Sequence, residues 1–279
     1  MLNFKKYPRI TKVVIPDNVQ LNNATNLFLN MRNLQSVYLP KHITIYNNTF
    51  RNCICLQQAI CGNNVTDMSS AYYGCTNLTT AACGDNVTSM TNTYFRCTNL
   101  TTAVCGDNVT SMYWTYYGCT NLTTAVCGNN VTNMANAYRD CKSLTTAVCG
   151  DNVTNMANAY SGCTNLTTAV CGNNVTSMTN AYRDCTKIQG NAYIYSKYVQ
   201  NFRHCFRNRD ASNMLNLYIQ NNSTSLTSVR KETSTASLTG TAISWTDAIS
   251  TMGCYYNTTH NIYIYPVSNV AESRMNNGD

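Results

Sequence analysis

Cysteine is the residue type with the most chemistry to offer in this chain of 279 residues, which contains 16 of them. Most fall into two series whose members recur every 22 residues. One series is Cys61, Cys83, Cys105, Cys127, Cys149 and Cys171; the other is Cys53, Cys75, Cys97, Cys119, Cys141, Cys163 and Cys185. Thiols in such series can pair as disulfides, bind a metal or fill a core.

The regular spacing argues against disulfides. Equivalent residues in adjacent coils of a parallel stack lie about 4.8 Å apart with parallel side chains, whereas a disulfide needs converging Cβ atoms about 3.8 Å apart. We therefore expect reduced thiols that act as small apolar fillers, with Cys61, Cys83, Cys105, Cys127, Cys149 and Cys171 as a structural core ladder. No CxxC occurs and the three histidines, His42, His204 and His260, lie far from any cysteine pair, so no metal site is predicted.

No catalytic constellation is visible in the sequence. The chain has no nucleophile elbow, phosphate loop or HExxH motif, and the few acids lie at turn positions of the repeat: Asp85, Asp107 and Asp151 at one position and Asp67 at another. Identical positions along a ladder cannot define one unique pocket. The sequence therefore predicts no enzyme, no catalytic residue and no cofactor.

Aromatic and arginine residues offer a different chemistry, that of recognition. At one position of the repeat the residues run Tyr73, Phe95, Tyr117, Arg139, Ser161 and Arg183, and Tyr113 and Trp114 add to the aromatic coils. Tyr, Trp and Arg are enriched at binding hot spots. The candidate binding set is Tyr73, Phe95, Tyr113, Trp114, Tyr117, Arg139 and Arg183; the alternative is that these side chains lie flat and only shield the surface.

These residues are positioned by a repeat. The 22-residue unit typified by CTNLTTAVCGDNVTSMYWTYYG begins at Cys53, Cys75, Cys97, Cys119, Cys141 and Cys163 without insertion or deletion. A fixed period of this length is typical of a solenoid, in which each coil buries its apolar face only by stacking on its neighbours. We expect an N-terminal cap with irregular repeats at 1–52, six regular repeats at 53–187, and irregular repeats with a C-terminal cap or attachment region at 188–279.

Within the unit, LTTAVCGDNV follows the template of a leucine-rich repeat, with Leu100, Ala103, Cys105 and Val109 in the inward slots and Asn108 in the turn slot. The chain resembles BspA-like leucine-rich repeat proteins over about residues 13–205. The resemblance implies an α/β repeat solenoid: a right-handed coil with a parallel β-sheet on the concave face and short helical or 3₁₀ segments on the convex face.

The same resemblance implies a non-enzymatic recognition or adhesion protein. No signal peptide and no membrane-inserting segment is seen, so a full-length chain would be assembled from the cytoplasm. This favours a virion surface component, a tail fibre or head-surface protein, that binds a protein or glycan on a cell or contacts virion structural proteins. A self-assembling homo-oligomer or filament and a secreted bacterial adhesin stay open as alternatives.

The charge pattern argues against nucleic acid as the partner. Only 11% of the residues are charged, and the formal net charge of +7 comes mostly from the two ends of the chain. No aromatic–basic motif accompanies these basic ends, so we interpret them as solvated caps.

Overall fold

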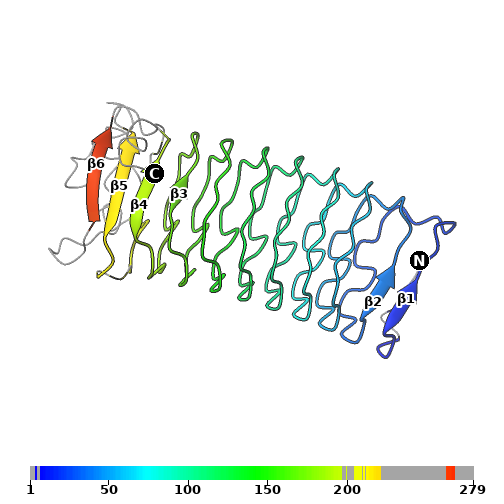
Figure 1. Cartoon of the computed structure of the whole chain (residues 1–279). Coiled ribbons are helices and arrows are strands. Elements are labelled where there is room, and N and C mark those ends of the chain that lie inside the picture. Colours follow the sequence, from blue (N-terminus) through cyan, green and yellow to red (C-terminus); the bar gives the residue numbers. More distant parts are fainter. Residues whose placement is uncertain are drawn as a thin grey trace, which may run out of the picture.

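The computed structural model describes residues 4, 7–196, 199, 204–208, 210, 212–220 and 262–267. Successive coils lie side by side in one elongated stack (Figure 1). Two small parallel sheets lie toward the ends of this stack. The first contains β1 (Lys12–Val14) and β2 (Ser36–Tyr38); the second contains, in order, β3 (Val170–Cys171), β4 (Gly190–Ile194), β5 (Leu215–Gln220) and β6 (Ile262–Val267). Much of the predicted C-terminal region 188–279 lies outside the described residues.

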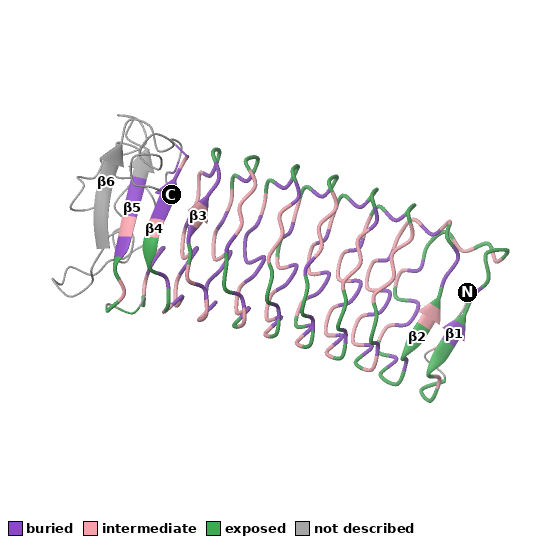
Figure 2. Cartoon of the chain, viewed as in Figure 1, coloured by how far each residue is buried: buried purple, intermediate pink, exposed green. Residues whose placement is uncertain are grey.

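A continuous stack of buried aromatic rings runs along the interior. We call it the core stack, and its ring centroids are 5.1–5.6 Å apart. Its members are Phe4, Phe28, Phe50, Tyr72, Tyr94, Tyr116, Tyr138, Tyr160, Tyr182 and Phe206. Leu100, Val109, Met112 and their equivalents pack around it, and the interior of every coil is buried (Figure 2). Each coil therefore buries its apolar side chains against its neighbours, as the repeat predicts.

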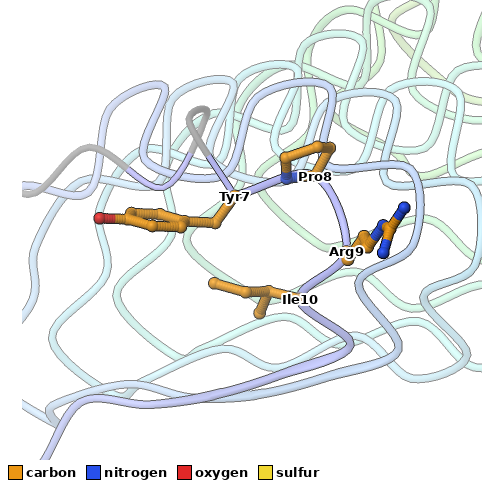
Figure 3. A pocket seen from close by; sticks show the side chains of 4 residues that line it. All are labelled: Tyr7, Pro8, Arg9 and Ile10. Atoms are coloured by element: carbon orange, nitrogen blue, oxygen red, sulfur yellow. The ribbon is translucent and has the colours of Figure 1, made fainter.

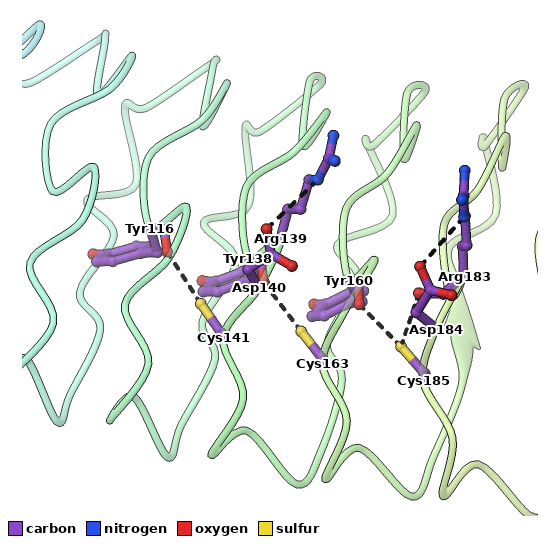
Figure 4. A network of polar contacts seen from close by, with 10 residues as sticks. All are labelled: Tyr116, Tyr138, Arg139, Asp140, Cys141, Tyr160, Cys163, Arg183, Asp184 and Cys185. Atoms are coloured by element: carbon purple, nitrogen blue, oxygen red, sulfur yellow. Dashed lines mark hydrogen bonds and ion pairs between the residues drawn. The ribbon is translucent and has the colours of Figure 1, made fainter. Parts of the chain in front are cut away.

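The two cysteine series differ in burial. The series that begins at Cys53 is fully buried, and its thiols donate to the carbonyl oxygen of the core-stack residue in the preceding coil, at 3.0–3.1 Å (Figure 4). In the predicted core ladder only Cys171 is buried, while Cys61, Cys83, Cys105, Cys127 and Cys149 are half-buried. All cysteines of both series are free thiols. The fully buried thiols thus connect coils as well as filling space.

The predicted sheet is interrupted in the regular coils that precede β3, where the described residues form only isolated parallel bridges. There the hydroxyl of a core-stack tyrosine bonds the backbone: that of Tyr116 accepts a hydrogen bond from the N–H of Val104 at 2.9 Å and donates to the Val104 carbonyl at 2.5 Å. Equivalent tyrosines do the same in the neighbouring coils. At these residues the hydroxyl satisfies the backbone donor and acceptor without a neighbouring strand. Val170 keeps the same two bonds at the start of β3.

The predicted helical or 3₁₀ segments are wrong for the regular coils, because the stretch between each methionine and the next cysteine consists of turns. In the part of the chain that the structure describes, no helix is long and apolar enough to span a membrane. Alternate N–H groups of this stretch bond the following coil, for example Tyr94 to the carbonyl of Thr115 at 2.9 Å. Left-handed residues such as Asn92 also break a right-handed helix. Bonds between coils therefore replace bonds within a helix.

Candidate functional site

A half-buried column of stacked side chains follows the core stack one residue later in five successive coils. The rings of Tyr73 and Phe95 are 4.4 Å apart at 4°, and those of Phe95 and Tyr117 are 4.6 Å apart at 19°. Arg51 covers the Tyr73 ring at 4.2 Å, and Arg139 lies over Tyr117 at 5.8 Å. We call these five residues the surface column. Its order, arginine–three rings–arginine, follows directly from the 22-residue period.

Trp114 and Tyr113 extend this column sideways. The Trp114 ring lies 4.8 Å from Tyr117 and 5.9 Å from Phe95, tilted against both. Tyr113 meets Trp114 edge-on at 6.0 Å and is 40% exposed, which makes it one of the most exposed large side chains of the described residues. The predicted aromatic residues are therefore brought together into one cluster.

Sequence reasoning missed two arginines of this cluster. Arg51 stands one period before Tyr73, so the spacing alone would have found it. Arg96 lies 5.5 Å from the Phe95 ring and 5.9 Å from the Tyr117 ring. A Cβ atom at Gly118 would come within 3.3 Å of the Arg96 side chain, so the glycine of the next coil leaves room for it. We define the recognition surface as the surface column together with Arg96, Tyr113 and Trp114.

Arg183 does not join the recognition surface. It lies two coils beyond Arg139, with the buried Ser161 at the same position of the coil between them. Its Nε is 3.3 Å from the Asp184 carboxylate, and Arg139 makes the equivalent but longer contact with Asp140 at 3.8 Å (Figure 4). The predicted binding set is therefore split, with six members in the cluster and Arg183 apart.

Two members of the recognition surface have an unfavourable backbone conformation. Each coil holds two left-handed residues four positions apart, and sixteen of these eighteen residues are Asn, Asp, Gly, Ser or His. The other two are Trp114, with φ of 57°, and Arg96, with φ of 56°. A bulky side chain in this region costs about 1–2 kcal/mol. Strained residues of this kind gather at functional sites, and both exceptions contact the rings of the surface column.

We expect Trp114→Asn to leave the free energy of unfolding unchanged or to raise it by up to about 1 kcal/mol. Asparagine occupies this position in Asn92, Asn136 and the next two coils, and its backbone tolerates the left-handed conformation. This gain offsets the lost ring contacts. Urea unfolding of the two proteins measures the difference, and a loss larger than about 1 kcal/mol would show that Trp114 is needed for folding.

Three other features of the described residues are poorly suited to chemistry. Burial raises the pKa of Cys61, Cys105 and Cys149 to about 12, so these thiols are poor nucleophiles at neutral pH. Among the described residues, no group of three His, Cys, Asp or Glu side chains could hold a metal ion. A hollow of about 430 Å³ near the N-terminus is lined by Tyr7, Pro8, Arg9 and Ile10, without an acid or a nucleophile (Figure 3).

Comparison with known proteins identifies the repeat. A family described as "BspA type Leucine rich repeat region (6 copies)" matches residues 3–122 and 113–233. No curated protein matches. The resemblance seen in the sequence is therefore confirmed over most of the chain.

Several solved structures are similar, all at low identity. The pneumococcal vaccine antigen PcpA is 11% identical, with a TM-score of 0.53 over 93% of this chain and 69% of that protein. A leucine-rich cell-surface protein of Faecalibacterium prausnitzii is 15% identical (TM-score 0.43; 81% and 92% covered). A leucine-rich repeat protein of Eubacterium ventriosum is 20% identical (TM-score 0.48), with 55% of this chain and 42% of that protein covered. At this identity the similarity concerns the fold alone.

Proposed function

Because this chain belongs to the family of BspA-type leucine-rich repeat proteins, we propose that it is a non-enzymatic recognition protein that attaches to a cell through the recognition surface. The observation that carries this proposal is the placement of Trp114 and Arg96. Both side chains occupy left-handed positions at a cost in stability, and both lie on the same cluster of rings. Because these residues lower the stability of the fold, we infer that they are retained for binding.

We further propose that the protein is displayed on a virion, as a tail-fibre or head-surface component. The free thiols of the regular coils support assembly in a reducing compartment, because a chain with many unpaired cysteines is best preserved where disulfides do not form. Its ligand would then be a molecule on the surface of the host cell.

The test is binding of the labelled, monodisperse protein to a panel of intact bacterial and human epithelial cells, measured by flow cytometry. In the variant to compare, Tyr113 and Tyr117 are changed to Ser and Trp114 to Asn. We expect it to lose about nine-tenths of the cell-bound signal or more, since anchor residues carry most of the binding energy.

The matched control is Tyr38→Ser, because Tyr38 is similarly exposed, at 44%, but lies on β2 away from the recognition surface. The control should bind cells like the unchanged protein. Equal binding by the triple variant, or binding to none of the cells, would overturn the proposed function.

A further inference from the structure

Resting on the proposed function, we infer that the recognition surface binds an acidic polypeptide segment, with Trp114 and Arg96 as its anchors. Three observations carry this inference: the use of the ring faces, the charge around them and the backbone cost of the two anchors.

The ring faces of the surface column are already occupied. Phe95 is stacked between Tyr73 and Tyr117, at 4.4 and 4.6 Å. The outer faces of the end rings are covered by Arg51 and Arg139. Sugars and unpaired nucleic-acid bases bind aromatic side chains by stacking on a free face. The surface column instead presents ring edges and hydroxyl groups, which suit the side chains and backbone of a polypeptide.

The charge of the recognition surface is positive. It contains Arg51, Arg96 and Arg139, and the carboxylate near them is Asp140, 3.8 Å from Arg139. Neither Arg51 nor Arg96 forms an ion pair with a described residue, unlike Arg139 and Arg183, so both keep uncompensated charges. A guanidinium that lies over a ring keeps its N–H edge available for a carboxylate. Arg51 already donates one of its N–H groups to the Oδ1 of Asn48 at 3.2 Å. Charge complementarity therefore selects an acidic partner.

The backbone cost marks the centre of the contact. Trp114 and Arg96 are the two bulky residues at left-handed positions, and both lie against the Phe95 and Tyr117 rings from adjacent coils. Gly118, in the coil after Arg96, leaves the space into which the Arg96 side chain extends. An aromatic anchor beside an arginine with free N–H groups matches a peptide that places an apolar residue next to Asp or Glu.

The test uses three probes: a random copolymer of glutamate and tyrosine, a poly-deoxythymidine oligonucleotide and a neutral dextran. Fluorescence anisotropy should show binding of the copolymer, weakened as salt rises from about 0.05 to 0.5 M. Trp114→Asn and Arg96→Asn should each weaken that binding by about tenfold or more, because each removes an anchor. The control Lys187→Asn removes an exposed cation outside the recognition surface and should bind as before.

Preferred binding of the oligonucleotide or the dextran would overturn the inference, as would copolymer binding that Trp114→Asn and Arg96→Asn leave unchanged. The asparagine variants keep a residue that suits the left-handed backbone, so circular dichroism should show both folded. The outcome is separable from that of the proposed function. If the copolymer does not bind while cell binding still depends on Tyr113, Trp114 and Tyr117, the ligand class is wrong and the recognition function stands.

Discussion

Raising the pH above about 9 should unfold the protein in one cooperative transition that is complete within about two pH units. Burial raises the pKa of the thiols that bridge the coils, among them Cys75, Cys97 and Cys141, above the ordinary value of 9.0. Burial likewise raises the pKa of the core-stack tyrosines, such as Tyr116 and Tyr138, above 10.0. All these groups are neutral in the folded protein.

The sign of the effect follows from proton linkage. Below pH 9 the thiols are protonated in the folded and the unfolded chain alike, so their full contribution to stability is present. Above pH 9 the unfolded chain releases protons that the folded chain retains, and stability falls by about 1.4 kcal/mol per thiol and pH unit. The seven fully buried thiols together lose on the order of 10 kcal/mol per unit, which matches the whole stability of a typical domain.

The measurement is a pH titration under reducing conditions, followed by circular dichroism and by the absorbance of ionised tyrosine. Both signals should change together, since buried phenols ionise only when the coils separate. Replacing Cys119 with alanine should reduce the number of protons released on unfolding by about one, so that stability falls less steeply with pH. A protein that keeps its circular dichroism while all its tyrosines ionise near pH 10 would contradict this account of the core.

Changing Tyr116 to Phe is expected to cost about 2–4 kcal/mol of the free energy of unfolding. The hydroxyl serves two backbone groups of Val104, its N–H at 2.9 Å and its carbonyl at 2.5 Å. Without it both groups lose their partner. An unsatisfied buried group costs about 1–3 kcal/mol, and because Val104 is half-buried we expect about 1–2 kcal/mol for each. The adjacent coils offer no replacement, because Ala82 and Val126 are bonded by Tyr94 and Tyr138.

The neighbouring residue supplies the control. Tyr117→Phe removes a hydroxyl from the half-buried surface column and should change the free energy by less than about 0.5 kcal/mol. Urea unfolding of the two variants measures both values. If the two substitutions lower the free energy of unfolding equally, the hydroxyl of Tyr116 does not stabilise the backbone at Val104.

The sequence contained the signal for this interaction, although the predicted sheet overlooked it. The core stack has Phe50 and Phe206 near its ends and tyrosine in the regular coils. Twelve positions before Phe50 and Phe206 stand Tyr38 and Ile194, which belong to paired strands. In the coils from Tyr72 to Tyr160 the tyrosine hydroxyl bonds the backbone where no strand forms. Tyr182 makes the same bonds to Val170, which lies in β3, so the tyrosine by itself does not exclude a strand.

The 22-residue period predicted which side chains are buried, but it did not predict the hydrogen bonds between coils. The inward positions of Leu100, Val109, Met112 and Tyr116 follow from hydrophobic spacing, and all are fully buried. The half-burial of Cys105 and the turns after Met112 do not follow from it. The turns depend on hydrogen bonds between coils, which join residues 21 to 25 positions apart and leave no local pattern.

The sequence predicted only some members of the recognition surface, because the period shows the order of the residues and not their backbone conformation. Its aromatic members were found because they depart from the repeat. Arg96 was missed because only the backbone angle shows that it occupies a left-handed position. Arg183 was included because it shares the register of Arg139, yet the coil of Ser161 separates the two.

The most direct test of the central claim is one pair of measurements on Trp114→Asn in the same buffer: the free energy of unfolding and the affinity for the glutamate–tyrosine copolymer. We expect unchanged or greater stability together with about tenfold weaker binding, because Trp114 is kept for recognition and not for folding. Lower stability with unchanged affinity would contradict it, and would make Trp114 a packing residue of its coil.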